Sequence, residues 1–339
     1  MRDSAKRVKK SNRLMKLALL VCVSVPALWA AGSPALGVAQ TFPTKPLRIV
    51  VPVAAGGNLD LVTRSVAQKL SEQLGQQVIV ENRAGANGVL AADFVAKAPA
   101  DGYTYLSIAN TFVSTPAVVR SATYDPVRDF AGVSITAWLP QIVVLHPSVP
   151  ANSIKELIAL AKRRSSDLSY GSAGNGSTGH IAVELFSIQA GIKLTHVPYK
   201  GNAPALIDVV GGQISLMFDT ISTSIPYVKA GRVKALAVTS ATRSPIFPQL
   251  PTVSEAGLPG YEAAIFNGIV APAGTPREIL ARMNAEIAKA VQQPELRARF
   301  LQQGVELSAS ASADEATAFI KSETGKYAKI VREAGIRAE

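Results

Sequence analysis

The sequence predicts an α/β protein with two lobes, and three observations support this prediction. Apolar runs typical of buried strands alternate with segments that repeat apolar residues at helical spacing. A buried-strand run followed by a glycine turn and a helix occurs twice, after residues 47–53 and after residues 168–170. The last helices have no strands of their own, so we expect them to return to the first lobe. The chain then crosses between lobes near Gln141 and near Phe266, which predicts a double hinge and a cleft.

The first lobe begins with a continuous apolar run, residues 47–53, which is typical of a buried parallel strand. A glycine turn at residues 54–58 leads into a helix predicted over residues 60–74. Further strands are predicted over residues 77–81 and 103–109, with short helices between them. This alternation predicts a parallel sheet with right-handed crossovers, and ligands of such sheets lie at the carboxyl ends of the strands.

The second lobe is predicted to be another α/β unit, residues 141–264, inserted into a discontinuous first lobe of residues 40–140 and 265–339. A strand-rich stretch, residues 130–146, leads into it. Capping boxes predict three helix starts by their spacing, with a hydroxyl side chain at the cap and a glutamate three positions later. They are Ser153 with Glu156, Thr275 with Glu278, and Ser312 with Glu315.

The candidate functional site centres on residues 168–190, a strand followed by a glycine-rich turn and a helix. Glycines in the turn allow tight bends and close approach of a ligand to the backbone. A helix beginning near Ser177 leaves its first N–H groups unpaired and its positive dipole end exposed, which favours a carboxylate, phosphate or sulfate. The hydroxyls of Ser172, Ser177 and Thr178 add donors, and His180 lies in the first turn.

The residues of this turn also allow interpretations other than an anion site. Residues 174–179 match GxGxxG, but no acidic residue follows about twenty positions later to hold a ribose, which disfavours a dinucleotide site. The turn also falls one residue short of the GxSxG nucleophile elbow, because Asn175 replaces the first glycine. A serine hydrolase using Ser177, with His180 or His196 as base, therefore stays open as an alternative. So does a purely structural glycine turn.

Composition fits a globular protein and disfavours a nucleic-acid-binding one. The 339 residues are 48% hydrophobic and 17% charged, enough for two domains with substantial cores. The formal charge is +11, but residues 1–39 carry seven basic residues against one acidic residue, which leaves +5 for the remainder. The remainder shows no basic stripe with interleaved aromatics, so we expect no nucleic-acid partner.

The N-terminus has the pattern of a secretory signal peptide. A basic segment, residues 1–16, precedes an apolar stretch, residues 17–31, that is short for a membrane span. Small residues then offer a cleavage site near Ala39, and a retained signal anchor is the alternative. Cleavage would remove Cys22, the only cysteine, so the exported chain would have no disulfide, thiol nucleophile or cysteine metal site.

Several motifs together resemble a known family. The sequence is similar to the Bug-type, TctC-like receptors of tripartite tricarboxylate transporters over essentially the whole mature chain. The motifs that carry the resemblance are PVAAGGNLDLVTR (52–64), VENRAGANG (80–88), ADGYT (100–104), YGSAGNGSTGH (170–180), HVPYKG (196–201), LMFD (216–219) and APAGTP (271–276). The resemblance implies a two-lobed periplasmic-binding-protein fold of type II-like form, with a double-crossover hinge and an interdomain cleft that closes on a small organic anion.

The resemblance also implies the function and the site. We expect a monomeric periplasmic receptor, not an enzyme, without metal or cofactor, that binds a di- or tricarboxylate, amino acid or aromatic acid and delivers it to membrane permease subunits. A ligand sensor for a signalling kinase is a further alternative. Backbone N–H groups and hydroxyls are expected to hold the carboxylate. The implied ligand-binding residues are Ala54, Ala55, Gly56, Asn58, Asn110, Thr111, Ser172, Ala173, Gly174, Ser177, His180 and Asp219.

Some polar residues have a structural interpretation beside the functional one. Asp219 ends a predicted strand, where it either accepts a hydrogen bond from a ligand or caps the next turn. Asp60 is expected to cap its own helix or to pair with Arg64 four positions later. His146 and His196 lack the spacing of paired metal ligands and are interpreted as structural.

Overall fold

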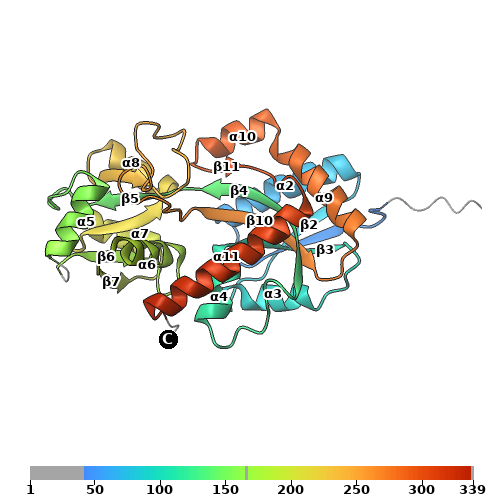
Figure 1. The fold of residues 1–339 in the computed structure, drawn as a ribbon. Helices are drawn as coiled ribbons and strands as arrows, with labels where there is room; N and C mark the ends of the chain where they lie inside the picture. The colour runs from blue at the N-terminus through green and yellow to red at the C-terminus, as the bar shows by residue number, and fades with distance from the viewer. Residues whose placement is uncertain (1–41, 165–166, 337–339) are drawn as a thin grey trace, which may run out of the picture. The chain divides into compact units, whose positions relative to one another are not determined.

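The computed structural model describes residues 42–164 and 167–336, and its elements all lie within the unit Pro43–Glu339 (Figure 1). The predicted signal peptide, residues 1–39, lies outside the described residues. Within the described part, the helices are too short or too polar to cross a lipid bilayer.

The first sheet has six strands in the order β11-β4-β10-β3-β1-β2. Their bounds are β1 Leu47–Val51, β2 Val78–Asn82, β3 Thr104–Ala109, β4 Phe130–Leu139, β10 Ile265–Pro272 and β11 Glu306–Leu307. On one face lie α2 (Asn58–Leu74), α9 (Arg277–Val291) and α10 (Pro294–Leu301), and on the other η1 (Ala86–Gly88), α3 (Val89–Ala96), α4 (Asn110–Val118) and α11 (Ala313–Ala334). This sheet therefore combines the start and the end of the described chain, as predicted for the returning terminal helices.

The predicted parallel pairing of the first three strands is confirmed, but the complete sheet is mixed. The strands β1, β2 and β3 are parallel, but β10 runs antiparallel to β3 and to β4. The physical reason is connectivity: β10 does not arrive through a crossover helix on this sheet but enters from the second sheet, in the opposite direction.

The second sheet has five strands in the order β7-β6-β8-β5-β9. Their bounds are β5 Gln141–Leu145, β6 Ser169–Ser172, β7 Thr195–Pro198, β8 Leu216–Thr220 and β9 Lys234–Val238. The covering helices are α5 Ile154–Arg163, α6 Thr178–Ala190, α7 Asn202–Val210 and α8 Ile221–Lys229. The chain changes sheet at Pro140, between β4 and β5, and again between β9 and β10, close to the two predicted crossings.

Two of the three predicted capping boxes are present. The side chains of Ser153 and Ser312 accept hydrogen bonds from the N–H groups of Glu156 and Glu315 and cap α5 and α11. The prediction at Thr275 is wrong, because α9 begins at Arg277 with Pro276 at the N-cap position, without a side-chain cap. Thr275 therefore lies one residue too early to cap the helix, and its hydroxyl donates to the carbonyl of Pro272 (2.8 Å).

Helix α11 connects the two sheets. Its first half lies on β4 so closely that a Cβ on Gly132 would come 2.5 Å from the backbone nitrogen of Thr317. Its second half packs against α4 and α6, and buried side chains of α6 and α11 share one hydrophobic core. Glycine at position 132 therefore allows a helix to bridge elements of both sheets.

Candidate functional site

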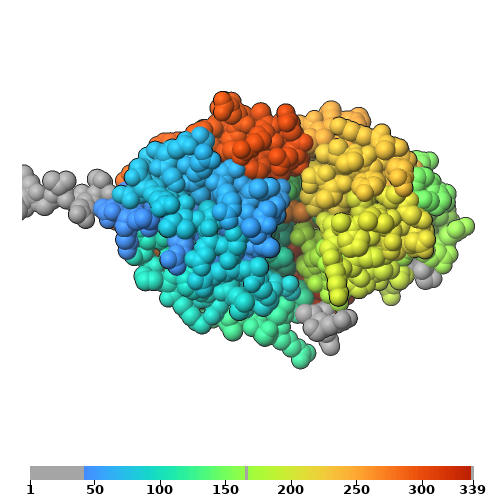
Figure 2. Space-filling model, turned by 180° about the vertical axis from the view of Figure 1, so that it is seen from behind, coloured from blue at the N-terminus to red at the C-terminus, as the bar shows by residue number. Residues whose placement is uncertain are grey.

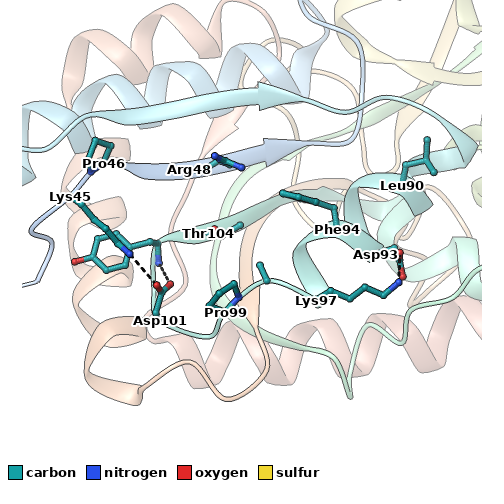
Figure 3. A pocket seen from close by; sticks show the side chains of 12 residues that line it. Lys45, Pro46, Arg48, Leu90, Asp93, Phe94, Lys97, Pro99, Asp101 and Thr104 are labelled. Atoms are coloured by element: carbon teal, nitrogen blue, oxygen red, sulfur yellow. Dashed lines mark hydrogen bonds and ion pairs between the residues drawn. The ribbon is translucent and has the colours of Figure 1, made fainter.

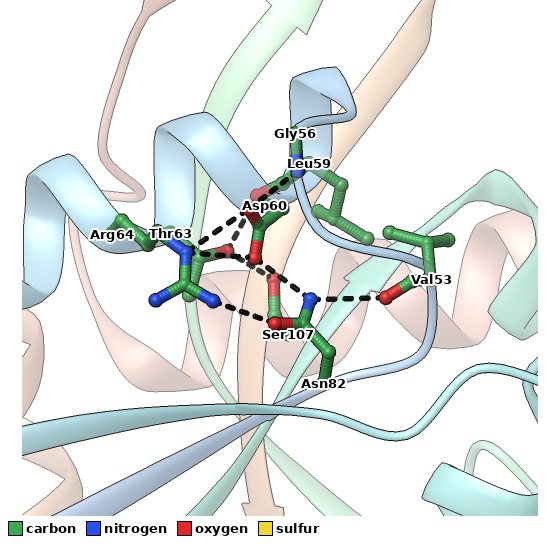
Figure 4. Close-up of polar contacts among 8 residues, drawn as sticks. All are labelled: Val53, Gly56, Leu59, Asp60, Thr63, Arg64, Asn82 and Ser107. Atoms are coloured by element: carbon green, nitrogen blue, oxygen red, sulfur yellow. Dashed lines mark hydrogen bonds and ion pairs between the residues drawn. The ribbon is translucent and has the colours of Figure 1, made fainter.

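The first glycine loop, residues 54–57, connects β1 with α2 and lies on the surface. Ala54, Ala55 and Gly56 are exposed, and the φ of Gly56 is +89°, which favours glycine. The N–H of Gly56 donates to Oδ2 of Asp60 (2.9 Å), so this predicted ligand-binding group already has an internal partner (Figure 4). Ala54 and Ala55 have no hydrogen-bond partner among the described residues.

Asp60 organises this loop. Its buried carboxylate accepts from Gly56, from Nε of Arg64 (3.0 Å) and from the amide of Asn82 (2.8 Å), and Asn82 also donates to the carbonyl of Val53 (Figure 4). Burial raises the pKa of Asp60, but the hydrogen bonds from Arg64, Gly56 and Asn82 outweigh it and the net pKa is lowered. The expected pairing of Asp60 with Arg64 is confirmed. The start of α2 thus already has a carboxylate beside it.

Polar side chains beneath the same loop bond to one another. Oδ1 of Asn58 accepts from the amide of Asn267 (3.2 Å), which links the start of α2 to β10. Thr63 donates to the carbonyl of Leu59 and shares a hydrogen bond of 2.7 Å with Ser107. These contacts fix the position of α2 on the first sheet.

Asn110 and Thr111 open α4, directly after β3. The amide of Asn110 donates to the carbonyl of Ala264 (3.1 Å) and to the hydroxyl of Tyr327 (2.5 Å), and its Oδ1 accepts from the N–H of Phe266 (2.9 Å). All three contacts join groups of the protein, and Asn110 is only 1% exposed. Thr111 is half-buried, and the structure places it in the first turn of the helix.

The second glycine loop follows β6. The hydroxyl of Ser172 is buried; it donates to the carbonyl of Gly174 (3.1 Å) and accepts from the N–H of the same residue (3.1 Å). Gly174 and Gly176 have φ values of +123° and +73°, which a side chain would strain. Ala173 is half-buried and has no hydrogen-bond partner among the described residues.

Helix α6 starts at this loop, at Thr178, next to the predicted start near Ser177, which caps the helix. The side chain of Ser177 accepts from the N–H of His180 (3.4 Å), and Nδ1 of His180 accepts from the N–H of Gly176 (3.0 Å). The first intrahelical bond is donated by Ile181 to the carbonyl of Ser177. Within the described chain, the N–H groups of Thr178 and Gly179 consequently have no acceptor.

Two imidazoles stack beneath the second loop. The rings of His180 and His196 lie 3.9 Å apart between centroids with an interplanar angle of 14°, and His196 stacks on Tyr170 in turn. The pKa of each imidazole is lowered to about 4, by burial in both and, for His180, also by the neighbouring His196. Both rings are therefore neutral at pH 7. Because Nδ1 of His180 is an acceptor, its neutral ring carries the proton on Nε2.

His196 belongs to the support of this loop, which the sequence reasoning did not foresee. Its Nε2 lies 2.6 Å from Oγ of Ser172, 24 positions away in the chain. The strand β7 places it there by pairing in parallel with β6, where His196 faces Tyr170. The structural interpretation of His196 was correct, but its contact with a predicted site residue required the strand register, which spacing alone does not give.

Asp219 lies inside the protein and not on a surface. Its side chain is 0% exposed, and Oδ2 accepts from the hydroxyls of Thr223 and Ser224, in the first turn of α8. Burial raises its pKa, against hydrogen bonds that lower it. The other carboxylate oxygen of Asp219, Oδ1, is buried and has no hydrogen-bond partner among the described residues. The contacts of Oδ2 tie Asp219 to the side chains of the first turn of α8, although α8 begins without a side-chain cap.

A hollow on the molecular surface separates the two groups of elements (Figure 2). Blue to cyan atoms from the first part of the chain form one side of it, and lime to yellow atoms from the middle form the other. The two sides come close together at Val118, the last residue of α4. A Cβ added to Gly176 would lie 3.0 Å from a methyl group of Val118. The second glycine loop thus lies close to an element of the first sheet.

A hollow of 730 Å³ lies elsewhere, between α3, β1 and the turn before β3 (Figure 3). None of the predicted site residues lines it. Four of its five charged side chains pair with one another, Lys45 with Asp101 (3.3 Å) and Lys97 with Asp93 (2.7 Å), and the fifth, Arg48, pairs with Glu81 (3.5 Å). The hollow is therefore separate from the candidate site. In the described residues, no group of three or more histidine, cysteine or acidic residues is arranged to hold a metal ion.

Comparison with known proteins identifies relatives along nearly the whole chain. Residues 62–336 match the model of the tripartite tricarboxylate transporter family receptor, TctC. The UPF0065 protein in the tcbD-tcbE intergenic region of Pseudomonas sp. (strain P51) is 39% identical over 300 residues, covering 88% of this chain and 89% of that protein. Protein BugT of Bordetella pertussis is 33% identical over 325 residues, covering 95% and 99%.

Solved structures agree with this assignment. Rpa4515 of R. palustris with adipate is 37% identical and superposes with a TM-score of 0.73, covering 88% of this chain and all of that one. MatC (Rpa3494) from Rhodopseudomonas palustris with bound malate is 31% identical with a TM-score of 0.70, covering 86% and 100%. The hydrolase alternative is overturned, since the family and its structural neighbours are solute receptors and not enzymes. The chain belongs to the Bug/TctC family of two-lobed tripartite tricarboxylate transporter receptors.

Proposed function

We propose that this chain is an extracytoplasmic receptor for a small dicarboxylate, bound between a lobe of residues 40–140 and 265–339 and a lobe of residues 141–264. The observation that supports this most is the start of α6. The N–H groups of Thr178 and Gly179 have no acceptor in the described chain, and they stand at the positive end of a 13-residue helix. A solute carboxylate would supply the missing acceptor.

The surroundings of α6 favour recognition by dipoles. His180 and His196 are neutral at pH 7, so neither places a full positive charge beside the start of α6. The family neighbours Rpa4515 and MatC were solved with adipate and malate, both dicarboxylates. We extend this class to the present chain, with one carboxylate at the start of α6 and the other toward the first glycine loop and α4.

The predicted site residues divide into two roles in this proposal. Those with unused amide or hydroxyl groups would contact the solute, and they are Ala54, Ala55, Thr111, Ala173 and Ser177. Those whose polar groups are already engaged would shape the loops, and they are Gly56, Asn58, Asn110, Ser172, Gly174, His180 and Asp219. His180 combines both roles, because its Nε2–H has no acceptor among the described residues.

The destination of the solute follows from the family. We propose that the receptor acts in the periplasm as a monomer, after removal of residues 1–39, and delivers its solute to the membrane subunits of a tripartite transporter. Deleting the gene should abolish uptake of the bound acid by cells that retain those subunits, and restoring the gene should recover it.

Calorimetry tests the solute class directly. The panel contains adipate, malate and glutamate, with hexanoate and 1,6-hexanediol as controls that remove one and both carboxylates of adipate. We expect saturable binding of at least one dicarboxylate and at least about hundredfold weaker binding of hexanoate. Equal binding of adipate and hexanediol would contradict a carboxylate site. Native mass spectrometry of freshly purified protein, searching for a retained acid, extends the panel beyond these compounds.

A further inference from the structure

The segment that returns the chain from the second sheet to the first, residues 261–266, is fastened on both sides. It joins the second sheet through Thr239, a buried residue whose hydroxyl donates to the carbonyl of Ala263 (3.1 Å) and accepts from the N–H of Gln141 (2.9 Å). Gln141 begins the other crossing. The two crossing segments are therefore tied together where they enter the second sheet.

The fastening to the first sheet is the side chain of Asn110. Its amide binds the backbone on both sides of Ile265, donating to the carbonyl of Ala264 and accepting from the N–H of Phe266. The side chain thus imitates a neighbouring strand at the point where β10 begins. Because Asn110 is the first residue of α4, the start of that helix is held directly against the crossing segment.

The fastening to α6 is Tyr261. Its buried hydroxyl donates to the carbonyl of Ala182 (2.8 Å), in the first half of α6, and its ring packs against Phe186 at 5.9 Å. The same short segment therefore holds the starts of α4 and α6, the two helices whose first turns bear predicted solute-binding residues.

Helix α11 supports this arrangement from behind. The hydroxyl of Tyr327 receives the second hydrogen bond from the amide of Asn110, and both residues are buried. The half of α11 that contains Tyr327 also packs against α6. Both N–H groups of the Asn110 side chain and its Oδ1 are consequently engaged by the crossing segment or by α11.

We propose that Asn110 is a positioning residue that clamps segment 261–266 against α4, and that this clamp sets the balance between open and closed lobes. The inference builds on the proposed function and assigns Asn110 a different role from direct solute contact. Without the hydrogen bonds of Asn110, the two lobes of the unliganded protein would adopt additional relative orientations. In these orientations the starts of α4 and α6 would not be aligned for solute binding. The binding-competent fraction falls, and the apparent affinity falls with it.

The first test measures the unliganded protein. Spin labels at Gln68→Cys on α2 and Gln189→Cys on α6, both exposed, report the distance between lobes by double electron–electron resonance. The background carries Cys22→Ser, because Cys22 is the chain's only cysteine. We expect Asn110→Ala to broaden the distance distribution, and Tyr327→Phe, which removes one hydroxyl and keeps the ring, to broaden it less.

Tyr124→Phe is the matched control. The hydroxyl of Tyr124 is also buried and donates to the carbonyl of Phe112 (2.8 Å) on α4, but it does not touch the crossing segment. It should leave the distribution unchanged while lowering the urea midpoint as much as Tyr327→Phe does. Equal distributions for the two tyrosine variants, or an unchanged distribution in Asn110→Ala, would overturn the clamp.

The second test separates positioning from contact by stopped-flow kinetics with adipate. A clamp predicts that Asn110→Ala lowers the association rate about tenfold and changes the dissociation rate less than twofold. A rise confined to the dissociation rate would instead identify a lost solute contact and overturn the proposal. If adipate does not bind the unmodified protein, the assignment of this solute fails, while the distance measurement still decides the clamp.

Discussion

The two glycine loops follow the same pattern in the sequence but differ in how their amides are satisfied. In the first loop a charged carboxylate, that of Asp60, accepts the N–H of Gly56 beside the start of α2. In the second, neutral groups accept: the hydroxyl of Ser172 binds the N–H of Gly174, and the ring of His180 binds that of Gly176. The positive end of α2 is therefore offset by a carboxylate of the protein itself, whereas the positive end of α6 is not.

This difference has an electrostatic consequence. An anion at a helix N-terminus offsets the positive end of the helix dipole, so α2 attracts a second anion less than α6 does. Neutral acceptors organise the loop before α6 and leave its dipole uncompensated. We therefore expect the two lobes to contribute unequally to solute binding. The second glycine loop would hold the carboxylate, and the first would shape the remainder of the solute site.

The largest expected effect comes from blocking the second loop with Gly174→Val. Gly174 has a φ of +123°, and a Cβ there would lie 3.3 Å from the carbonyl oxygen of Tyr199. The loop must rearrange, so affinity for the solute should fall about hundredfold or more by calorimetry.

Gly191→Ala is the control for backbone strain, because Gly191 has a φ of +62° at the other end of α6 and open space around its Cβ position. It should lower the melting temperature and leave affinity within about twofold. A loss of affinity in Gly191→Ala as large as that in Gly174→Val would mean that general destabilisation, and not the loop, determines binding.

Asp60→Asn tests the first loop, where we expect stability and affinity to separate. The substitution removes the charge that pairs with Arg64 and places an amide where Asn82 and Gly56 donate, so the free energy of unfolding should fall by about 2 kcal/mol. Affinity should be unchanged or slightly higher, because a negative charge near the cleft is gone.

The control for Asp60 is Asp93→Asn, in an exposed pair with Lys97, which should cost less than about 0.5 kcal/mol. The pKa of Asp60 is lowered in the folded state, so its contribution to stability is present above the unfolded pKa and is lost as pH falls through the folded one. A hundredfold loss of affinity in Asp60→Asn would show that the two loops are equivalent after all.

The histidine pair makes the second loop sensitive to acid. The pKa of His180 is about 4 in the folded protein against an ordinary histidine pKa of 6.5, so the unfolded chain binds more protons between these values and stability falls as pH decreases. From pH 7 to pH 5 this loss is about 2 kcal/mol for His180. Urea unfolding at both pH values measures it.

His180→Asn isolates that contribution, since the asparagine oxygen can still accept from Gly176 but does not titrate. The comparison with the unmodified protein is necessary because Glu184 and Asp219 have raised pKa values, which give stability the opposite dependence on pH. Identical pH dependence in the two proteins would refute a neutral, buried His180.

Local features of the fold and site followed from the sequence. The capping boxes at Ser153 and Ser312 and the pair of Asp60 with Arg64 involve residues at most four positions apart. Short-range spacing is sufficient for such contacts because the helix itself sets the geometry.

Long-range features did not follow. The sequence places Asn110 and Asp219 at strand ends but does not reveal their partners in the fold. The partners of Asn110 lie 154 to 217 positions away, and Asp219 is closed off by the turn into α8. The contact of Ser172 with His196 depends on the register of β6 with β7. Which polar group is already engaged is a property of packing, and no spacing in the chain encodes it.

The smallest effect is expected for Ser177→Ala, and it distinguishes capping from solute contact. Ser177 caps α6 beside the loop, and Ser153 caps α5 in the same way at a distance from both loops. Each substitution by alanine should lower the free energy of unfolding by about 1 kcal/mol, measured by urea titration. Because the hydroxyl hydrogen of Ser177 is left to donate to a solute, only Ser177→Ala should also weaken binding, by about fivefold. Equal affinities in the two variants would limit Ser177 to its capping role and assign solute recognition at this loop to backbone amides alone.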